Sequence, residues 1–210
     1  MYKSFLKRVI DIIISLTAII VLFVPMAVIA IAIRLTSRGP ALFKQKRLGK
    51  GKRTFYILKL RTMRLDAPSG VPTAELTDAQ EWITPIGRFL RRTSLDELPQ
   101  LFNILIGQMS LVGPRPTVPA EEELTLEREK YGVYDLRPGL TGWAQIHGRD
   151  GISATEKARL DGEYAEKIKS GFITGLLIDI RCILGTFGAV FKGEGRPADT
   201  DKKNEKITKN

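Results

Sequence analysis

The chain has 210 residues, of which 43% are hydrophobic, and its 33 lysines and arginines exceed its 23 aspartates and glutamates, giving a formal charge of +10. This length suits one modest domain with an appended segment, and it is long enough to bury a core. The charge points to an anionic partner, such as nucleic acid, an anionic membrane surface or a phosphorylated substrate. The single cysteine, Cys182, excludes an intrachain disulfide, and the single histidine, His147, excludes a His-rich zinc site.

The first predicted element is a long apolar helix near the N-terminus. The 22 residues from Ile12 to Ile33 carry no charge, and as a helix they would extend roughly 33 Å, close to the thickness of a hydrocarbon core. A secretory signal peptide has a shorter apolar core of about 7–15 residues, so we interpret the run as a membrane segment. Pro25 lies near its middle and cannot donate a hydrogen bond to Val21, which predicts a kink.

The charges that flank this segment bear on its topology. Lysine and arginine are enriched in cytoplasmic flanks, and here they occur on both sides. Together with Pro25, this pattern favours a re-entrant helix that enters one leaflet, bends and returns to the same side. A spanning helix with a tolerated proline is the alternative. The flanking cations are Lys3, Lys7 and Arg8 before the run and Arg34, Arg38, Lys44, Lys46 and Arg47 after it.

The rest of the chain predicts an α+β fold that is mostly helical with a small β-hairpin. Residues Ala41–Lys46 and Thr54–Leu60 partly alternate between apolar and polar, and a glycine-containing turn at Gly49–Gly51 separates them. Apolar periodicity predicts helices over residues 82–92 and 172–192 and an amphipathic helix that includes Leu98 to Ile106. Residues 121–130 suit a charged, solvated helix and 153–169 a polar helix, with loops over 65–79 and 136–151.

The helix predicted over 172–192 carries a broad apolar stripe, with its charges on the remaining surface. Such a helix fits a protein core and a membrane interface equally well. From Gly193 onward, glycine, proline, lysine and asparagine dominate, and this composition predicts a disordered tail.

Two adjacent acids, Asp96 and Glu97, stand out in the segment "RTSLDELPQLFNIL". Ser94 and Glu97 match the capping box of a helix N-terminus, which would give the pair a structural role. Proline is favoured at the first helical position, so a helix that starts at Pro99 would instead leave the pair on irregular backbone. These residues by themselves leave both interpretations open.

Cations surround the acid pair in the sequence, and cations near a carboxylate keep it ionised, as a nucleophile or a metal ligand must be. Arg115 stands between two prolines in "VGPRP". The prolines restrict its backbone, and its planar guanidinium suits bidentate phosphate binding. A plain surface turn explains that string equally well. The cations near the pair are Lys59, Arg61, Arg88, Arg91, Arg92 and Arg115.

Four segments resemble the bacterial sugar transferase family, the monotopic phosphoglycosyl transferases. They are "KRVIDIIISL", "FYILKLRTM", "RRTSLDELPQLFNILIGQMSLVGPRP" and "RPGLTGWAQIHGR", and the resemblance runs from about Tyr2 to Arg181. It implies an enzyme that moves a sugar 1-phosphate from a UDP-sugar to a polyprenyl phosphate, usually undecaprenyl phosphate, releases UMP and requires Mg²⁺. It also implies the first membrane step of a bacterial glycan pathway, at the cytoplasmic face of the inner membrane.

The same resemblance suggests roles for individual residues. Asp96 would be the nucleophile that forms an aspartyl-phosphosugar, and Mg²⁺ would lie near it. Glu97 would assist as a base or by positioning metal and phosphate. Pro25 corresponds to the helix break, although Val24 stands where many members have serine. Lys59, Arg91 and Arg115 match cationic positions of the family, and Arg61, Arg88, Arg137 and Arg149 are further candidate substrate-binding residues.

The expected partners are a UDP-sugar, undecaprenyl phosphate and the lipid of one leaflet, with no nucleic acid, and a homodimer is compatible with these expectations. We expect a re-entrant helix with its flanks over residues 1–38, a cytoplasmic catalytic domain with interfacial helices over 39–192, and the tail over 193–210. Two alternatives are a non-catalytic, membrane-anchored basic scaffold and a membrane phosphatase. The sequence names neither the sugar nor the glycan.

Overall fold

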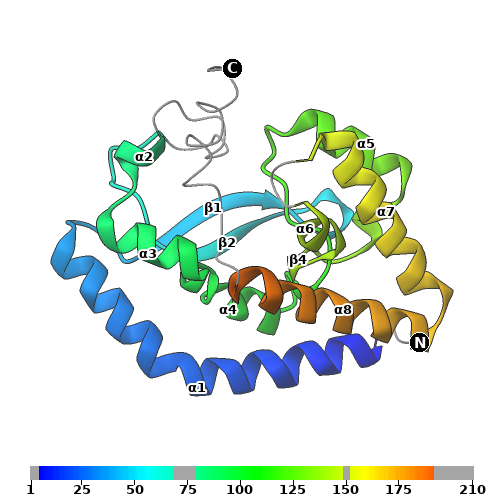
Figure 1. The fold of residues 1–210 in the computed structure, drawn as a ribbon, viewed down its shortest axis with the longest axis horizontal. Coiled ribbons are helices and arrows are strands. Elements are labelled where there is room, and N and C mark those ends of the chain that lie inside the picture. The colour runs from blue at the N-terminus through cyan, green and yellow to red at the C-terminus, as the bar shows by residue number, and fades with distance from the viewer. Residues whose placement is uncertain (1–4, 69–78, 149–151, 192–210) are drawn as a thin grey trace, which may run out of the picture.

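A computed structural model describes residues 5–68, 79–148 and 152–191. The predicted tail and most of the predicted loop over 65–79 lie outside the described residues. The described chain is mostly helical with two small sheets (Figure 1). Its helices are α1 Lys7–Thr36, α2 Ala79–Trp82, α3 Pro85–Thr93, α4 Gln100–Leu105, α5 Glu122–Lys130, α6 Trp143–His147, α7 Ala154–Ser170 and α8 Phe172–Phe191. Its strands are β1 Leu42–Leu48, β2 Thr54–Leu60, β3 Ser110–Val112 and β4 Gly139–Thr141, and 3-10 turns lie at Lys50–Lys52, Leu95–Glu97 and Val133–Asp135.

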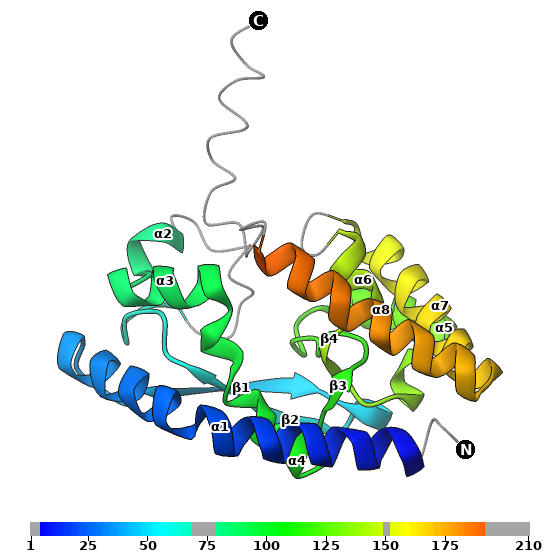
Figure 2. The same cartoon turned by 60° about the horizontal axis from the view of Figure 1, so that its bottom comes forward.

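Helix α1 runs along one face of the molecule and bends near its middle (Figures 1 and 2). By length and composition alone it could cross a membrane. Pro25 lies inside the helix, in agreement with the predicted kink. One narrow stripe of α1 is buried against the domain, and most of its remaining large apolar side chains are exposed. The buried residues are Asp11, Ser15, Ile19, Met26 and Ile33.

Both ends of α1 are attached to the same body. Near its start, Lys7 forms an ion pair with Asp179 of α8. The Arg8 guanidinium donates hydrogen bonds to carbonyl oxygens in the last turn of α4, at 2.6 and 2.7 Å. Near its end, Ile33 packs against Leu60 of β2 and Leu90 of α3. The whole helix is therefore fastened to the domain rather than projecting from it.

The predicted hairpin is confirmed. Strands β1 and β2 pair antiparallel from Leu42 opposite Leu60 to Leu48 opposite Thr54, so β1 continues two residues beyond its predicted end. Phe55 and Ile57 of β2 are buried in a cluster that also contains apolar residues of α4 and Ile19 of α1. The hairpin thus connects the membrane-capable helix to the interior.

The segment predicted as a loop over 136–151 contains both a strand and a helix, so that prediction is wrong. Strand β4 pairs parallel with β3, and α6 follows directly. A three-residue strand made of Gly139, Leu140 and Thr141 is too short to show alternation. A Cβ atom added to Gly139 would lie 2.1 Å from the backbone nitrogen of Gly113, so this close pairing requires glycine.

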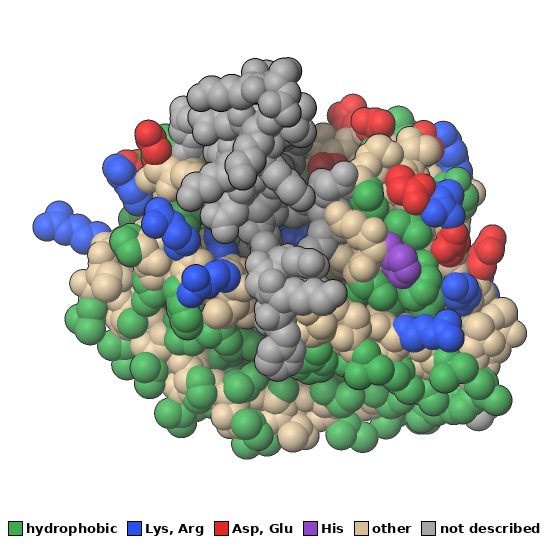
Figure 3. Space-filling model, viewed as in Figure 1, with side chains coloured by type: hydrophobic (Ala, Val, Ile, Leu, Met, Phe, Trp, Pro, Cys, Tyr) green, Lys and Arg blue, Asp and Glu red, His purple; other side chains and the backbone are tan. Residues whose placement is uncertain are grey.

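Helix α8 serves the core and presents an apolar surface at the same time. Ile178 and Cys182 are buried in a cluster with Tyr164 of α7 and Val112 of β3. The opposite face of α8 is exposed and apolar. Figure 3 shows hydrophobic side chains along the lower edge of the molecule, where α1 and α8 run in Figure 1, with the charged side chains above them. The exposed large apolar residues of α8 are Phe172, Ile173, Leu177, Ile180, Leu184 and Phe187.

Candidate active site

The backbone around the acid pair is irregular, and the capping-box interpretation is wrong. Helix α3 ends at Thr93, and Ser94 adopts a left-handed conformation with φ 57°, so its side chain makes no capping hydrogen bond. A single 3-10 turn then carries Asp96 and Glu97, and α4 follows with Pro99 at its N-cap position. The alternative in which the helix starts at the proline is therefore correct to within one residue.

The two acids have different surroundings. Asp96 is 2% exposed. Glu97 lies between two cations, with its Oε1 3.0 Å from Lys59 Nζ of β2 and 3.7 Å from a terminal guanidinium nitrogen of Arg115. Residues that are far apart in the sequence thus converge on one carboxylate, and the two neighbouring acids are available for different roles.

The segment that carries Arg115 is fixed through its backbone. The carbonyl oxygen of Arg115 accepts a hydrogen bond of 2.8 Å from Arg128 of α5. Arg128 donates two more, of 2.9 and 2.6 Å, to the carboxylate of Asp161 on α7. On the other side, Arg47 donates to the carbonyl oxygen of Pro116 at 3.1 Å. Helices α5 and α7 and strand β1 together therefore determine where the Arg115 guanidinium can reach.

The Arg128–Asp161 pair lies in the interior, where its side chains are 4% and 1% exposed. Burial raises the pKa of the Asp161 carboxyl above its ordinary value, against the opposing effect of the Arg128 charge. The ionised state of the pair hence depends on the contact between its two members.

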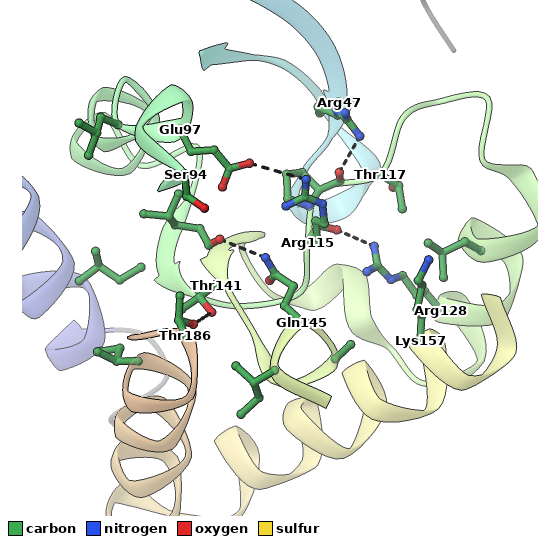
Figure 4. Close-up of a pocket in the computed structure, with 18 of the residues that line it drawn as sticks. Arg47, Ser94, Glu97, Arg115, Thr117, Arg128, Thr141, Gln145, Lys157 and Thr186 are labelled. Carbon is green, nitrogen blue, oxygen red and sulfur yellow. Dashed lines mark hydrogen bonds and ion pairs between the residues drawn. The ribbon is translucent and has the colours of Figure 1, made fainter. Parts of the chain in front are cut away.

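A cavity of about 520 Å³ opens beside Glu97 (Figure 4). In the close-up, Glu97 and Arg47 lie near the top, Arg115 lies in the middle, Arg128 and Lys157 lie toward α7, and Thr186 of α8 lies below Glu97 beside Thr141. The Thr186 hydroxyl is hydrogen-bonded to that of Thr141 in β4. The polar side chains that line the cavity are Arg47, Ser94, Glu97, Arg115, Thr117, Glu121, Arg128, Thr141, Gln145, Lys157 and Thr186.

Of the predicted site residues, Glu97, Lys59 and Arg115 come together in direct contact. Asp96 is not among the residues that line the cavity, although Ser94 and Glu97 on either side of it are. Arg91 donates a 2.9 Å hydrogen bond from Nε to the hydroxyl of Thr62, just after β2. These predicted site residues therefore lie on or near the 3-10 turn Leu95–Glu97.

Other predicted substrate-binding residues lie elsewhere. The Arg61 guanidinium donates to the carbonyl oxygens of Ser37 and Arg38, which secures the chain just after α1. Arg88 is exposed on α3. Arg137 donates to the carbonyl oxygen of Gly107 at 2.9 Å and lines a second cavity of about 320 Å³ near the start of α1. Arg149 lies outside the described residues.

Sequence reasoning missed several cavity residues. Arg128 and Lys157 lie on helices that were predicted only as charged or polar, and nothing in their spacing distinguishes them from solvent-exposed residues. Arg47 was assigned only to the charge flanking the apolar run. Gln145 lies in a segment predicted as loop, and its side chain donates to the carbonyl oxygen of Leu140 at 3.1 Å. Only tertiary contacts bring these residues to one cavity.

A comparison with protein families identifies the chain. The model of the bacterial sugar transferase family matches residues 2–193, which include every described residue of the site. The chain belongs to the bacterial sugar transferase family. Its acid pair, its Arg115 segment and its N-terminal apolar helix are therefore features of a family member, as the resemblance in the sequence implied.

Three named bacterial proteins are similar in sequence to this chain. A Caulobacter vibrioides UDP-glucose:undecaprenyl-phosphate glucose-1-phosphate transferase is 46% identical over 73% of this chain and 58% of its own length. The exopolysaccharide production protein PSS of Rhizobium leguminosarum bv. phaseoli is 38% identical over 86% of this chain and 92% of its own. An Erwinia amylovora UDP-galactose-lipid carrier transferase is 36% identical over 92% of this chain and 42% of its own. The chain thus spans less than two thirds of the first and third relatives.

The acid pair of this family member suits a magnesium ion that is shared with a substrate. Proteins usually hold Mg²⁺ through one or two carboxylates together with substrate phosphates. Among the described residues, no group of three or more His, Cys, Asp or Glu side chains lies together. Asp96 and Glu97 are two adjacent carboxylates next to cations that can also hold phosphates. The described residues thus supply the one or two carboxylates that such an ion requires.

Proposed function

We propose that the protein transfers a sugar 1-phosphate from a UDP-sugar to undecaprenyl phosphate, with release of UMP, as the first membrane step of a bacterial glycan pathway. The observation that carries the proposal is the contact of Glu97, beside Asp96, with Lys59 and Arg115 at the edge of a cavity. Membership of the sugar transferase family and the names of its relatives support the same reaction.

The proposed reaction has two displacements at one phosphorus atom. A carboxylate oxygen of Asp96 attacks the β-phosphorus of the UDP-sugar, and the bond from that phosphorus to the bridging oxygen breaks, so UMP leaves. A phosphate oxygen of undecaprenyl phosphate then attacks the same phosphorus and displaces the Asp96 carboxylate, which is regenerated. Carboxylates form comparable phosphoryl intermediates in other enzymes. The product is undecaprenyl-diphosphate-sugar.

The other residues would act by charge and position. Phosphoryl transfer depends mainly on alignment and on neutralising the phosphate oxygens. Lys59 and Arg115 supply positive charge, and their contacts with Glu97 support a positioning role for that acid. Mg²⁺ held by Asp96 and Glu97 would neutralise part of the charge on the diphosphate. The contact from Arg128 to the Arg115 backbone supports the alignment of the Arg115 guanidinium.

We also propose that α1 is re-entrant and that the protein is monotopic, at the cytoplasmic face of the inner membrane. A spanning helix would separate its ends by a hydrocarbon core of about 30 Å. Here Lys7 and Ile33, near opposite ends of α1, both contact the one domain. The bend in α1 and the exposed apolar faces of α1 and α8 support burial in one leaflet, with α8 as an interfacial helix. Residues 1–38 would form the membrane segment and 39–192 the catalytic domain.

The test is release of UMP from a panel of UDP-sugars, beginning with UDP-glucose and UDP-galactose, by the purified protein with undecaprenyl phosphate. Asp96→Asn should abolish release, and Glu97→Gln should lower it strongly. Mass spectrometry of the wild-type protein after UDP-sugar alone should find a phosphosugar on Asp96. Full activity of Asp96→Asn would refute the nucleophile assignment. Bare phosphate on Asp96 would indicate a phosphatase, and no release from any UDP-sugar would favour a binding protein.

A further inference from the structure

The cavity beside Glu97 has one side that no nucleotide sugar requires. Its lining includes the charged residues Glu97, Arg115, Arg128 and Lys157, but apolar side chains from six parts of the fold also line it, next to polar ones such as Thr141 and Thr186. Apart from the faces of its uracil ring, a UDP-sugar is polar and gains little from such a surface. The apolar lining residues on this side are Ile14, Leu98, Leu111, Leu140, Ala144, Ile146, Ile183 and Phe187.

The apolar side of the cavity is continuous with the apolar surface of the molecule. Ile14 of α1 and Phe187 of α8 line the cavity and are nevertheless 43% and 59% exposed. The two helices start at the same end of the molecule, where Lys7 pairs with Asp179, and they separate along their length in Figures 1 and 2. The cavity therefore has an apolar border on the surface that also carries the exposed residues of both helices.

Undecaprenyl phosphate, the acceptor of the proposed reaction, matches the cavity: it has a charged phosphate at one end and an apolar chain beyond it. Its phosphate must reach Asp96, while most of its chain stays in the leaflet. Lifting the phosphate to the acid pair would expose the first isoprene units to water unless the protein covered them. An apolar cavity wall that starts near Glu97 and ends at the membrane-facing surface removes that exposure.

We propose that Ile14 of α1 and Ile183 and Phe187 of α8 hold the first isoprene units of undecaprenyl phosphate, next to the phosphate-binding side of the cavity. The proposal rests on the transferase function proposed above and adds where the chain of the acceptor binds. Helix α1 then does more than anchor the protein, because one of its side chains forms part of the acceptor site.

Tryptophan substitutions that fill the space test the proposal with matched neighbours. Ile14→Trp and Ile183→Trp add bulk inside the cavity. Ile13→Trp and Leu184→Trp add the same bulk at adjacent, more exposed positions that do not line it. The two displacements are measured separately: the burst of UMP from UDP-sugar without acceptor, and the steady-state rate against undecaprenyl phosphate concentration.

We expect the two cavity variants to raise the KM for undecaprenyl phosphate by about tenfold or more, with a much smaller change in the UMP burst, and the two neighbours to resemble wild type. A normal burst also shows that a variant is folded. A water-soluble two-isoprene phosphate should accept the phosphosugar from wild type and lose this activity in Ile183→Trp.

Two results would overturn the proposal. One is an unchanged acceptor KM in both cavity variants with a normal burst. The other is an equal rise of the acceptor KM in the neighbour variants Ile13→Trp and Leu184→Trp, since the effect would then not depend on bulk inside the cavity. Absence of a UMP burst in wild type with every UDP-sugar is a different result, and it would refute the transferase function itself.

Discussion

The buried Arg128–Asp161 pair supports a prediction whose size follows from its surroundings. Arg128 makes three hydrogen bonds, two to Asp161 and one to the carbonyl oxygen of Arg115. Replacing Asp161 with leucine leaves a guanidinium in the interior that cannot lose its proton. Removing one partner of a buried ion pair costs about 3–5 kcal/mol. In a protein of this length each kcal/mol lowers the melting temperature by about 2–4 °C, so we expect a fall of about 6–20 °C.

Replacing the other member of the pair, Arg128, should lower the stability less. In Arg128→Met the remaining carboxyl of Asp161 can take up a proton, because burial raises its pKa. When the pKa of an acid is higher in the folded than in the unfolded state, the acid does not destabilise the fold at a pH below its unfolded pKa of about 4, because it is protonated in both states. The loss of stability in Arg128→Met should therefore be smallest near pH 4 and grow as the pH rises through the folded pKa.

The assay is thermal unfolding of the purified protein in detergent between pH 4 and 8. The double variant Arg128→Met/Asp161→Leu should regain much of the stability that Asp161→Leu loses, since it leaves no buried charge. Arg159→Met, which removes the exposed partner of Glu156 and Glu163, is the control and should melt near the wild-type temperature. Equal melting temperatures for wild type and Asp161→Leu would refute the reasoning. Loss of Arg128 should also lower UMP release, because Arg115 loses its backbone support.

The remaining predictions concern the membrane helix, the cysteine and the packing of α3. In spheroplasts, Phe5→Cys and Thr36→Cys should both resist a membrane-impermeant maleimide until lysis, and labelling of either from outside would contradict the re-entrant topology. The native Cys182 should stay unlabelled in the folded protein after lysis, because burial raises its thiol pKa to about 12, and labelling on denaturation is the control. Gly87→Ala should destabilise the protein by about 1–3 kcal/mol, since its Cβ would lie 2.0 Å from a backbone carbonyl oxygen. Gly188→Ala is the control and should leave the stability unchanged, because open space surrounds that position. Chemical denaturation measures the free energy of unfolding of both variants.

Several elements were predictable because their signals are local. The uncharged run that ends at Ile33, the alternation in β2, the apolar stripe of α8 and the charged and polar segments of α5 and α7 each depend on residues close together in the chain. Pro99 likewise indicated where α4 begins, because proline is favoured at the start of a helix. Family motifs pointed to the acid pair.

Other features needed the folded chain. Strands β3 and β4 are three residues each and pair across a long separation, so neither carries a periodic signal. The left-handed conformation of Ser94 excludes the capping box. The sequence from Ser94 to Glu97 could not predict it, because the same residues fit both a capping box and a helix that starts at Pro99. These elements were missed or left open because local patterns carry no information about pairing partners.

The sequence by itself determined that this chain has a long apolar helix, a basic surface and an acid pair of the sugar transferase type. Only the tertiary structure decided which cations serve the pair. Lys59 and Arg115 reach Glu97, Arg61 secures the chain after α1, and Arg137 lies at another cavity. The physical reason is that an arginine can donate hydrogen bonds to a backbone carbonyl or to a carboxylate, so its role depends on which acceptor the fold brings within hydrogen-bonding distance.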